Sequence, residues 1–175
     1  PTGKDSLSMT QKYGDKKVYA PGTVIISTVG EVTDFRKIVI PVLKNDPATE
    51  IVYVDFSFDK LKLGGSSFAQ ILNKVGKEVP TTVDEWVDCL KAFRDGGAFT
   101  AIQQLVDEGI VLAGHDISAG GMVTALLEMC FADNRLGLDI DFSFLAEKDM
   151  IKILFAENPG VLIQIADKDA KKVSA

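Results

Sequence analysis

The chain has 175 residues, of which 46% are hydrophobic and 25% charged, with a net charge of -6 and a pI near 4.8. This is the composition of an ordinary globular domain, and the acidic charge argues against a nucleic-acid-binding protein, which would usually carry a basic face. No apolar run approaches the roughly 18 residues of a membrane-spanning helix, and no signal peptide is visible, so a cytoplasmic location is expected.

The first half of the chain predicts strands followed by helices. Residues 1–17 are polar and are expected to form an arm with a short strand at 7–11. Short connections between β-rich runs favour an antiparallel meander. These three runs are residues 23–29, 38–43 and 51–56. Helices are then predicted over residues 68–75, 82–90 and 95–108. Thr82 and Glu85 fit a capping box at the start of the second helix.

The second half mixes short apolar runs with helical periodicity. Strands are predicted at residues 110–113, 137–142 and 161–165, and helices at 122–131 and 147–156. The charged pattern from residue 167 to 175 looks like an unfinished helix. Because strands and helices do not alternate strictly, the sequence predicts an α/β (α+β) domain, a mixed sheet with helices packed on it. Cys89 and Cys130 lie in apolar helical surroundings and are expected to be reduced core thiols.

Three polar clusters could carry chemistry. The first, Lys4-Asp5-Ser6 after a glycine, lacks the upstream glycine of a P-loop. The second, Gly64-Gly65-Ser66, could hold an anion through backbone N–H groups, but a serine-capped helix start explains it equally well. The third, residues 115–118, stands between a buried strand and a helix, where a phosphate or its metal is a natural guest. Ordinary N-capping by Asp116 or Ser118 is the alternative.

The same clusters belong to an ordered set of six motifs. They are GKDSLSM (3–9), APGTVIIS (20–27), LGGS (63–66), GHDISAGG (114–121), LEM with FA (127–132) and FAENPG (155–160). Together they resemble the large, single-chain phosphoribosylformylglycinamidine synthases and, more loosely, the wider aminoimidazole ribonucleotide synthase superfamily. The resemblance covers nearly the whole chain. Each motif alone is weak, but six in order at natural spacing are specific.

The resemblance implies a fold, an activity and partners. It implies the C-terminal domain fold of that superfamily, with residues 1–17 ending a preceding subdomain and residues 18–175 forming a C-terminal subdomain cut short at its end. The family ligase converts formylglycinamide ribonucleotide, ATP and glutamine to formylglycinamidine ribonucleotide, ADP, phosphate and glutamate in purine biosynthesis. The other synthase-like subdomains and a glutaminase domain of a longer polypeptide would be the partners.

The resemblance also implies ligand-binding residues. Asp116 matches a carboxylate that binds Mg²⁺ at an ATP or ADP site, and Ser118 matches a nucleotide contact. A hard Mg²⁺ ion prefers carboxylate and phosphate oxygens, so the residue type suits the role. Lys4, Asp5 and Ser6, with Gly64, Gly65 and Ser66, form two further candidate ligand loops. No catalytic residue is assigned to this chain, and His115 is expected to be a structural neighbour of the site.

Two functional interpretations follow from these implied roles. The first is a fragment of an ATP-dependent amidotransferase-type ligase that is inactive alone because the rest of its site is missing. The second is a structural scaffold that holds a nucleotide without a direct part in catalysis, since the second nucleotide site of this enzyme type is understood to be largely structural. Apolar surface left by a missing partner subdomain would also favour self-association of the isolated chain, which light scattering would reveal.

Overall fold

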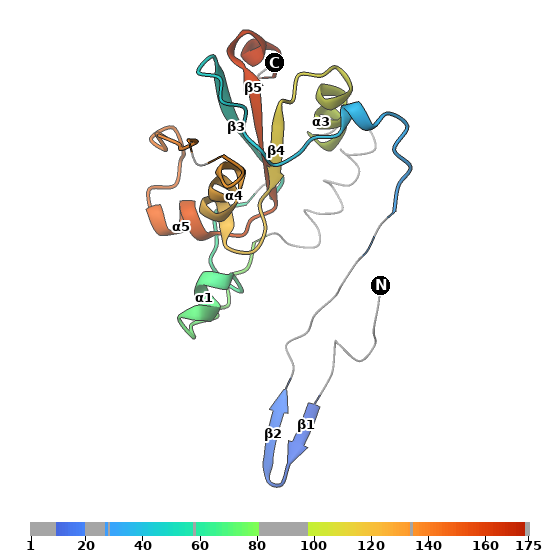
Figure 1. Ribbon diagram of the computed structural model, residues 1–175. Coiled ribbons are helices and arrows are strands. Elements are labelled where there is room, and N and C mark those ends of the chain that lie inside the picture. Colours follow the sequence, from blue (N-terminus) through green and yellow to red (C-terminus); the bar gives the residue numbers. More distant parts are fainter. Residues whose placement is uncertain are drawn as a thin grey trace. The chain divides into compact units, whose positions relative to one another are not determined.

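The computed structural model describes residues 10–19, 27, 29–57, 59–80, 98–133 and 135–173. It divides into two compact units, residues 1–35 and 36–175, which are treated separately. In the first unit, strands β1 (Thr10–Tyr13) and β2 (Lys16–Tyr19) form an antiparallel hairpin (Figure 1). The predicted strand at 7–11 overlaps only the start of β1, and the predicted strand at 23–29 lies almost entirely outside the described residues. The predicted subdomain boundary at residue 17 stays a prediction.

The second unit is built on a three-stranded antiparallel sheet with the order β3-β5-β4. Its strands are β3 (Thr49–Asp55), β4 (Ala113–Asp116) and β5 (Gly160–Ala166). Strand β5 is central, and Val161 pairs with Val54 of β3 on one side and with Asp116 of β4 on the other. The end of the chain therefore supplies the middle of the sheet.

Helices flank this sheet (Figure 1). The α-helices are α1 (Ser67–Ile71), α3 (Ala98–Asp107), α4 (Gly121–Cys130), α5 (Met150–Phe155) and α6 (Ala170–Val173), and the 3-10 helices are η2 (Phe35–Lys37) and η3 (Asp167–Asp169). Within the described ranges, no helix is long and apolar enough to cross a membrane. The α+β class predicted from the sequence is confirmed, and the ladders seen in it are antiparallel.

Alternate side chains of β5 belong to two hydrophobic clusters. Leu162 packs with the inner face of α4, including Met129, which is fully buried. Ile163 and Ile165 pack with Ile110 and with apolar side chains of α3 and α6. Helix α4 and helix α3 thus serve opposite faces of the sheet, as the two-residue period of a strand requires.

The predicted meander is wrong, because residues 38–43 form no ladder. Pro41 has no N–H to donate, and the segment makes single bonds instead. The Gly114 N–H donates to the Ile40 carbonyl at 3.2 Å, and the Leu43 N–H donates to the Met129 carbonyl at 3.1 Å. Leu43 is nevertheless buried, with 6% of its surface exposed. Ile38 and Ile40, by contrast, are 58% and 43% exposed, and the neighbour of β3 is β5 rather than an adjacent run in the sequence.

The strand predicted at residues 137–142 is also wrong. The segment is a loop whose side chains Ile140 and Phe142 pack on the α4 cluster, which is why its sequence alternates. The Asp141 carboxylate accepts the Ser143 N–H at 2.8 Å and turns the chain. Alternation therefore marked one buried face, which a loop can supply as well as a strand.

Several strands and helices also begin or end at residues other than those predicted. Strand β4 begins at Ala113 rather than residue 110, so His115 and Asp116 belong to the strand and not to the turn after it. Helix α5 starts at Met150, capped by Asp149, three residues later than predicted. Helix α1 ends at Ile71, which is 84% exposed although its spacing predicted burial. The helix predicted over residues 82–90, with its capping box, lies outside the described residues.

Candidate functional site

The turn between β4 and α4 depends on two consecutive glycines. Gly120 has φ of 95° and Gly121 has φ of 75°, values that side chains strain to adopt. A Cβ on Gly121 would lie 2.7 Å from the Leu154 carbonyl oxygen, at the end of α5. The Gly121 N–H also donates to the Ser118 carbonyl at 3.0 Å. Only glycine lets helix α4 begin this close to α5.

Side-chain capping does not explain the polar residues of this turn. The N-cap of α4 is Gly120, which has no side-chain hydrogen bond, so neither Asp116 nor Ser118 caps the helix. The Gly120 N–H instead donates to Oε1 of Glu157 at 2.8 Å. The two side chains that the sequence singled out are therefore free of the ordinary structural task that competed with ligand binding.

Asp116 and Ser118 are both exposed. Asp116 is the last residue of β4, and 73% of its side chain is accessible to solvent. Among the described residues, its only ion-pair neighbour is the imidazole of His115, with Nδ1 3.4 Å from Oδ1. Ile117, between Asp116 and Ser118, points into the core and donates its N–H to the Gly160 carbonyl at 2.8 Å. With Ile117 buried between them, Asp116 and Ser118 are both left exposed to solvent.

Asp116 lies on the rim of a groove of about 370 Å³. The groove is mainly apolar and lies between β4, β5, helix α3 and the segment at 39–41; its lining includes Val39, Ile102, Val106 and Val161. The polar residues His115 and Gln103 also line the groove. An apolar wall with a carboxylate at its edge could receive a flat ring while the carboxylate meets a cation.

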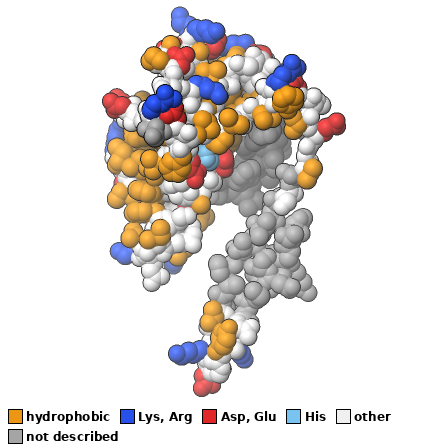
Figure 2. Space-filling model, viewed as in Figure 1, with side chains coloured by type: hydrophobic (Ala, Val, Ile, Leu, Met, Phe, Trp, Pro, Cys, Tyr) orange, Lys and Arg blue, Asp and Glu red, His pale blue; other side chains and the backbone are white. Residues whose placement is uncertain are grey.

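His115 connects the strand to helix α4. Its ring is largely buried, with 14% of the side chain exposed, and Nε2 lies 2.9 Å from Oε2 of Glu128. Nδ1 lies 2.8 Å from the backbone oxygen of Asp116. Both ring nitrogens therefore already have oxygen neighbours, which suits the structural role expected for this residue. Figure 2 shows the histidine colour at the surface beside acidic side chains.

The Gly64-Gly65-Ser66 loop uses its polar groups internally. The Gly64 N–H donates to Glu78 and the Gly65 N–H to Val75, both at 2.8 Å. Ser66 is 2% exposed, and its hydroxyl caps α1 by accepting the Ala69 N–H at 3.2 Å while donating to the Leu63 carbonyl. The serine-capped helix start, one of the two interpretations left open above, is what the structure contains. A ligand role for this loop stays a prediction.

Glu157 joins this loop to the turn before α4. Its Oε1 accepts the Ser67 N–H at 2.7 Å and the Gly120 N–H at 2.8 Å. The following residue, Asn158, is 1% exposed, and its side chain forms hydrogen bonds with Ser57, Lys60 and Lys62. Sequence reasoning read residues 157–160 as a simple turn and missed both roles. Two polar side chains between a buried helix and a buried strand were the available signal.

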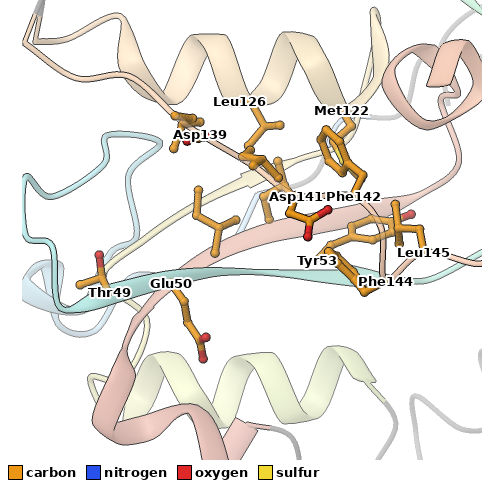
Figure 3. Close-up of a pocket in the computed structure, with 14 residues that line it drawn as sticks. Thr49, Glu50, Tyr53, Met122, Leu126, Asp139, Asp141, Phe142, Phe144 and Leu145 are labelled. Atoms are coloured by element: carbon orange, nitrogen blue, oxygen red, sulfur yellow. The ribbon is translucent and has the colours of Figure 1, made fainter.

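A second cavity, also of about 370 Å³, lies between β3, α4 and the loop at 138–145 (Figure 3). Its walls are apolar, and its charged side chains are all acidic: Glu50, Asp139 and Asp141. Burial, with the Asp55 carboxylate nearby, raises the pKa of Tyr53 well above its ordinary value. Like charges would repel a phosphate group here, so this cavity does not compete for a nucleotide.

The structure thus sorts the predicted site residues. Asp116 and Ser118 share one exposed edge, Glu157 links that edge to residues 64–67, and Lys4, Asp5 and Ser6 lie outside the described residues. In the described part of the chain, no three His, Cys, Asp or Glu side chains gather in a way that could hold a metal ion.

Cys130 is free, and burial raises the pKa of its thiol, which makes it a poor nucleophile.

Comparison with known proteins places this geometry in a family. The family described as "AIR synthase related protein, C-terminal domain" matches residues 61–175. The chain belongs to this family. The AIR synthase related match covers the GGS loop, the turn before α4 and residues 155–160 in a single domain.

The relatives agree with the resemblance drawn from the six motifs, which is confirmed. The chain is 36% identical to "Probable phosphoribosylformylglycinamidine synthase" of Caenorhabditis elegans over 95% of its length, and 36% identical to the human "Phosphoribosylformylglycinamidine synthase" over 98%. It spans only 13% and 12% of those two proteins. "Structure of PurLQS from Thermotoga maritima" matches 79% of this chain and 21% of that one, with a TM-score of 0.51 and 20% identity, which supports the fold.

Proposed function

We propose that this AIR synthase related domain is part of an ATP-dependent C–N ligase of purine biosynthesis. The reaction would convert formylglycinamide ribonucleotide to formylglycinamidine ribonucleotide, with glutamine as the nitrogen donor and a glutaminase domain elsewhere in a longer cytoplasmic polypeptide. Identity of 36% to two proteins named phosphoribosylformylglycinamidine synthase supports the assignment. Because the chain spans about an eighth of each, it would supply one wall of a site.

Within that ligase, Asp116 and Ser118 would contact Mg²⁺ and a nucleotide. The observation that carries this proposal is the exposed Asp116 carboxylate at the end of β4, beside an apolar groove and free of any capping role. One carboxylate fits Mg²⁺, which usually keeps several waters and binds through one or two carboxylates and phosphate oxygens. The bound ion would neutralise phosphate charge. Ser118, which is also exposed, would donate a hydrogen bond from its hydroxyl group to a phosphate or ribose oxygen.

The same geometry bears on whether the site turns over its nucleotide. His115 is the only histidine, and its two nitrogens already face Glu128 and the Asp116 carbonyl. A group held this way is poorly placed to move a proton to or from a substrate. This favours the second interpretation, in which Asp116 and Ser118 hold a nucleotide as a scaffold, over direct catalysis by this wall of the site.

Substitution of Asp116 by alanine in the full-length enzyme tests the proposal. We expect the variant to lose Mg²⁺-dependent nucleotide binding, measured as nucleotide content after gel filtration and as ADP affinity by calorimetry. Asp139→Ala is the matched control, because Asp139 is another exposed aspartate but lines the other cavity. Unchanged content and affinity in Asp116→Ala would contradict the site.

The pattern of loss separates the two interpretations. Loss of bound nucleotide together with a lower unfolding temperature indicates a scaffold. Loss of ligase turnover with nucleotide content and stability intact indicates a direct part in catalysis. Isolated residues 1–175 should bind ATP and Mg²⁺ weakly or not at all, since the rest of the pocket is missing. Their exposed apolar side chains, which include Ile71, Phe131 and Phe144, should favour self-association. Figure 2 shows hydrophobic side chains gathered on one face of the molecule.

A further inference from the structure

We propose that Glu157 is a positioning residue of the nucleotide site: its carboxylate ties residues 64–67 to the turn at 118–121 and so holds Asp116 and Ser118 in place. This inference rests on the proposed nucleotide site. It adds a residue that lies outside the GHDIS motif and whose two hydrogen bonds go to Ser67 and Gly120.

The first support is the hydrogen-bond geometry. A single oxygen, Oε1 of Glu157, accepts N–H groups from two segments that are far apart in the sequence, Ser67 at 2.7 Å and Gly120 at 2.8 Å. Bonds from N–H to a carboxylate are stronger than those between neutral groups, so this oxygen is an effective link. Because Gly120 lies two residues after Ser118, its position sets the path of the turn.

The second support is the balance of charge. Among the described residues, Glu157 makes no ion pair with a lysine, arginine or histidine. Its half-buried negative charge is therefore met by two backbone N–H groups, that of Ser67, the first residue of α1, and that of Gly120, the N-cap of α4. Glu157 thus already satisfies the Gly120 N–H at the start of α4. The ligand is left with the outward side chains of Asp116 and Ser118.

The third support is that Glu157 is itself held on both sides. Before it, the ring of Phe155 stacks on Phe68 of α1, with centroids 4.6 Å apart and an angle of 22° between the planes. After it, the buried side chain of Asn158 bonds to three residues of the segment at 57–62. A carboxylate fixed in this way can impose its position on the loops it binds. The Gly160 carbonyl, which accepts the Ile117 N–H at 2.8 Å, continues the same support along the turn.

The structure suggests a pair of substitutions that separate length from charge. Glu157→Gln keeps an oxygen acceptor at the same reach, and in the described part of the chain no donor is bonded to Oε2, where the amide nitrogen would go. Glu157→Asp keeps the charge but is one methylene too short to reach both N–H groups. If positioning matters, the glutamine variant should behave like the wild type and the aspartate variant should not.

The experiment measures ADP affinity by calorimetry at saturating Mg²⁺, in the full-length enzyme stripped of nucleotide and below the unfolding temperature of every variant. We expect Glu157→Asp to weaken binding about tenfold, which corresponds to about 1.4 kcal/mol, and Glu157→Gln to stay within about threefold. Glu147→Asp is the matched control, because Glu147 also accepts two backbone N–H groups at a helix start, those of Lys148 and Asp149, but links no second loop. It should leave ADP affinity within about twofold.

Hydrogen exchange by mass spectrometry supplies a readout that does not depend on nucleotide. Peptides containing Ser67 and Gly120 should both exchange faster in Glu157→Asp than in the wild type, and neither should change in Glu147→Asp. If the wild type binds ADP and Glu157→Asp binds it equally well, the positioning role is wrong while the site stands. If the stripped wild type binds no ADP, the proposed site itself fails, whatever the exchange data show.

Discussion

Two segments of this domain looked alike in the sequence but are built differently. Residues 64–67 and residues 118–121 are both glycine- and serine-rich, and both lead into a helix. In the first, Ser66 turns inward and caps α1, and the glycine N–H groups bond within the loop. In the second, glycines replace the side-chain cap and Ser118 stays exposed. A helix start that needs no side-chain cap leaves its polar side chains available to a ligand.

One carboxylate serves both segments, and this explains how the second can do without a cap. Glu157 accepts an N–H from each, so the α4 turn receives from a distant residue what the α1 loop partly makes for itself. The comparison predicts different sensitivities. The α1 loop should depend on the Ser66 side chain, and the α4 turn should depend on the absence of side chains at its glycines.

The largest effect is expected at Gly121. Gly121→Ala adds a Cβ 2.7 Å from the Leu154 oxygen and forces alanine to φ of 75°, so the free energy of unfolding should fall by roughly 3 kcal/mol or more. Gly109→Ala isolates the backbone strain, since its φ is 71° with nothing within 4 Å, and should cost roughly 1 kcal/mol. Gly137→Ala meets neither obstacle and should stay within about 0.5 kcal/mol.

Urea unfolding of the purified chain measures all three substitutions. Equal losses for Gly121→Ala and Gly109→Ala would show that helices α4 and α5 can move apart at no cost. The close approach between the two helices would then not be a fixed feature of the turn.

The next effect distinguishes the two serines. Ser66→Ala removes the α1 cap and one of the two hydrogen bonds to the Leu63 carbonyl, so the free energy of unfolding should fall by about 1–2 kcal/mol. Ser118→Ala should change it by less than about 0.5 kcal/mol, because the residue is exposed. In the full-length enzyme, Ser118→Ala should instead lower nucleotide affinity. A stability loss at Ser118 as large as that at Ser66 would remove the contrast on which the site assignment depends.

Sequence patterns predicted which segments pack against the core better than they predicted which segments pair as strands. The apolar spacing of α4 placed its helix within one residue at each end, because a ten-residue amphipathic segment has few alternatives. In residues 38–43 and 137–142, Leu43 is buried and Ile140 and Phe142 are partly buried, yet neither segment became a strand. Whether an apolar run joins a ladder depends on which strand lies beside it, and here β5, from the end of the chain, took that place beside β3.

The candidate site likewise contains residues that the sequence indicated and one that only the fold reveals. Motif resemblance indicated Asp116 and Ser118, and both are exposed on either side of the buried Ile117. Glu157 could not be found in this way, because its role depends on two N–H groups that come from residues 67 and 120 and meet only in the fold. Composition and spacing carry no record of a hydrogen bond between such distant segments.

The smallest effect concerns a third helix start, α5, where the supporting carboxylate is local. Hydrogen bonds from the Asp149 and Lys148 N–H groups, helped by Lys152, lower the pKa of Glu147 below its ordinary value of 4.5. A lowered pKa in the folded state means that Glu147 contributes stability above about pH 4.5 and loses it as the pH falls through that range. The contribution should be small because the Glu147 side chain is only partly buried and the two residues whose N–H groups it accepts are exposed.

Glu147→Gln should therefore make the free energy of unfolding fall less steeply as the pH is lowered, while leaving its value near neutral pH almost unchanged. Urea midpoints between about pH 3 and pH 6 measure this pH dependence. Asp139→Asn removes one negative charge from an exposed position and is the control for net charge. An unchanged acid limb in Glu147→Gln would mean that a carboxylate at a helix start adds little unless, as with Glu157, it also connects two segments. That result would strengthen the contrast between local and long-range support on which the α4 turn depends.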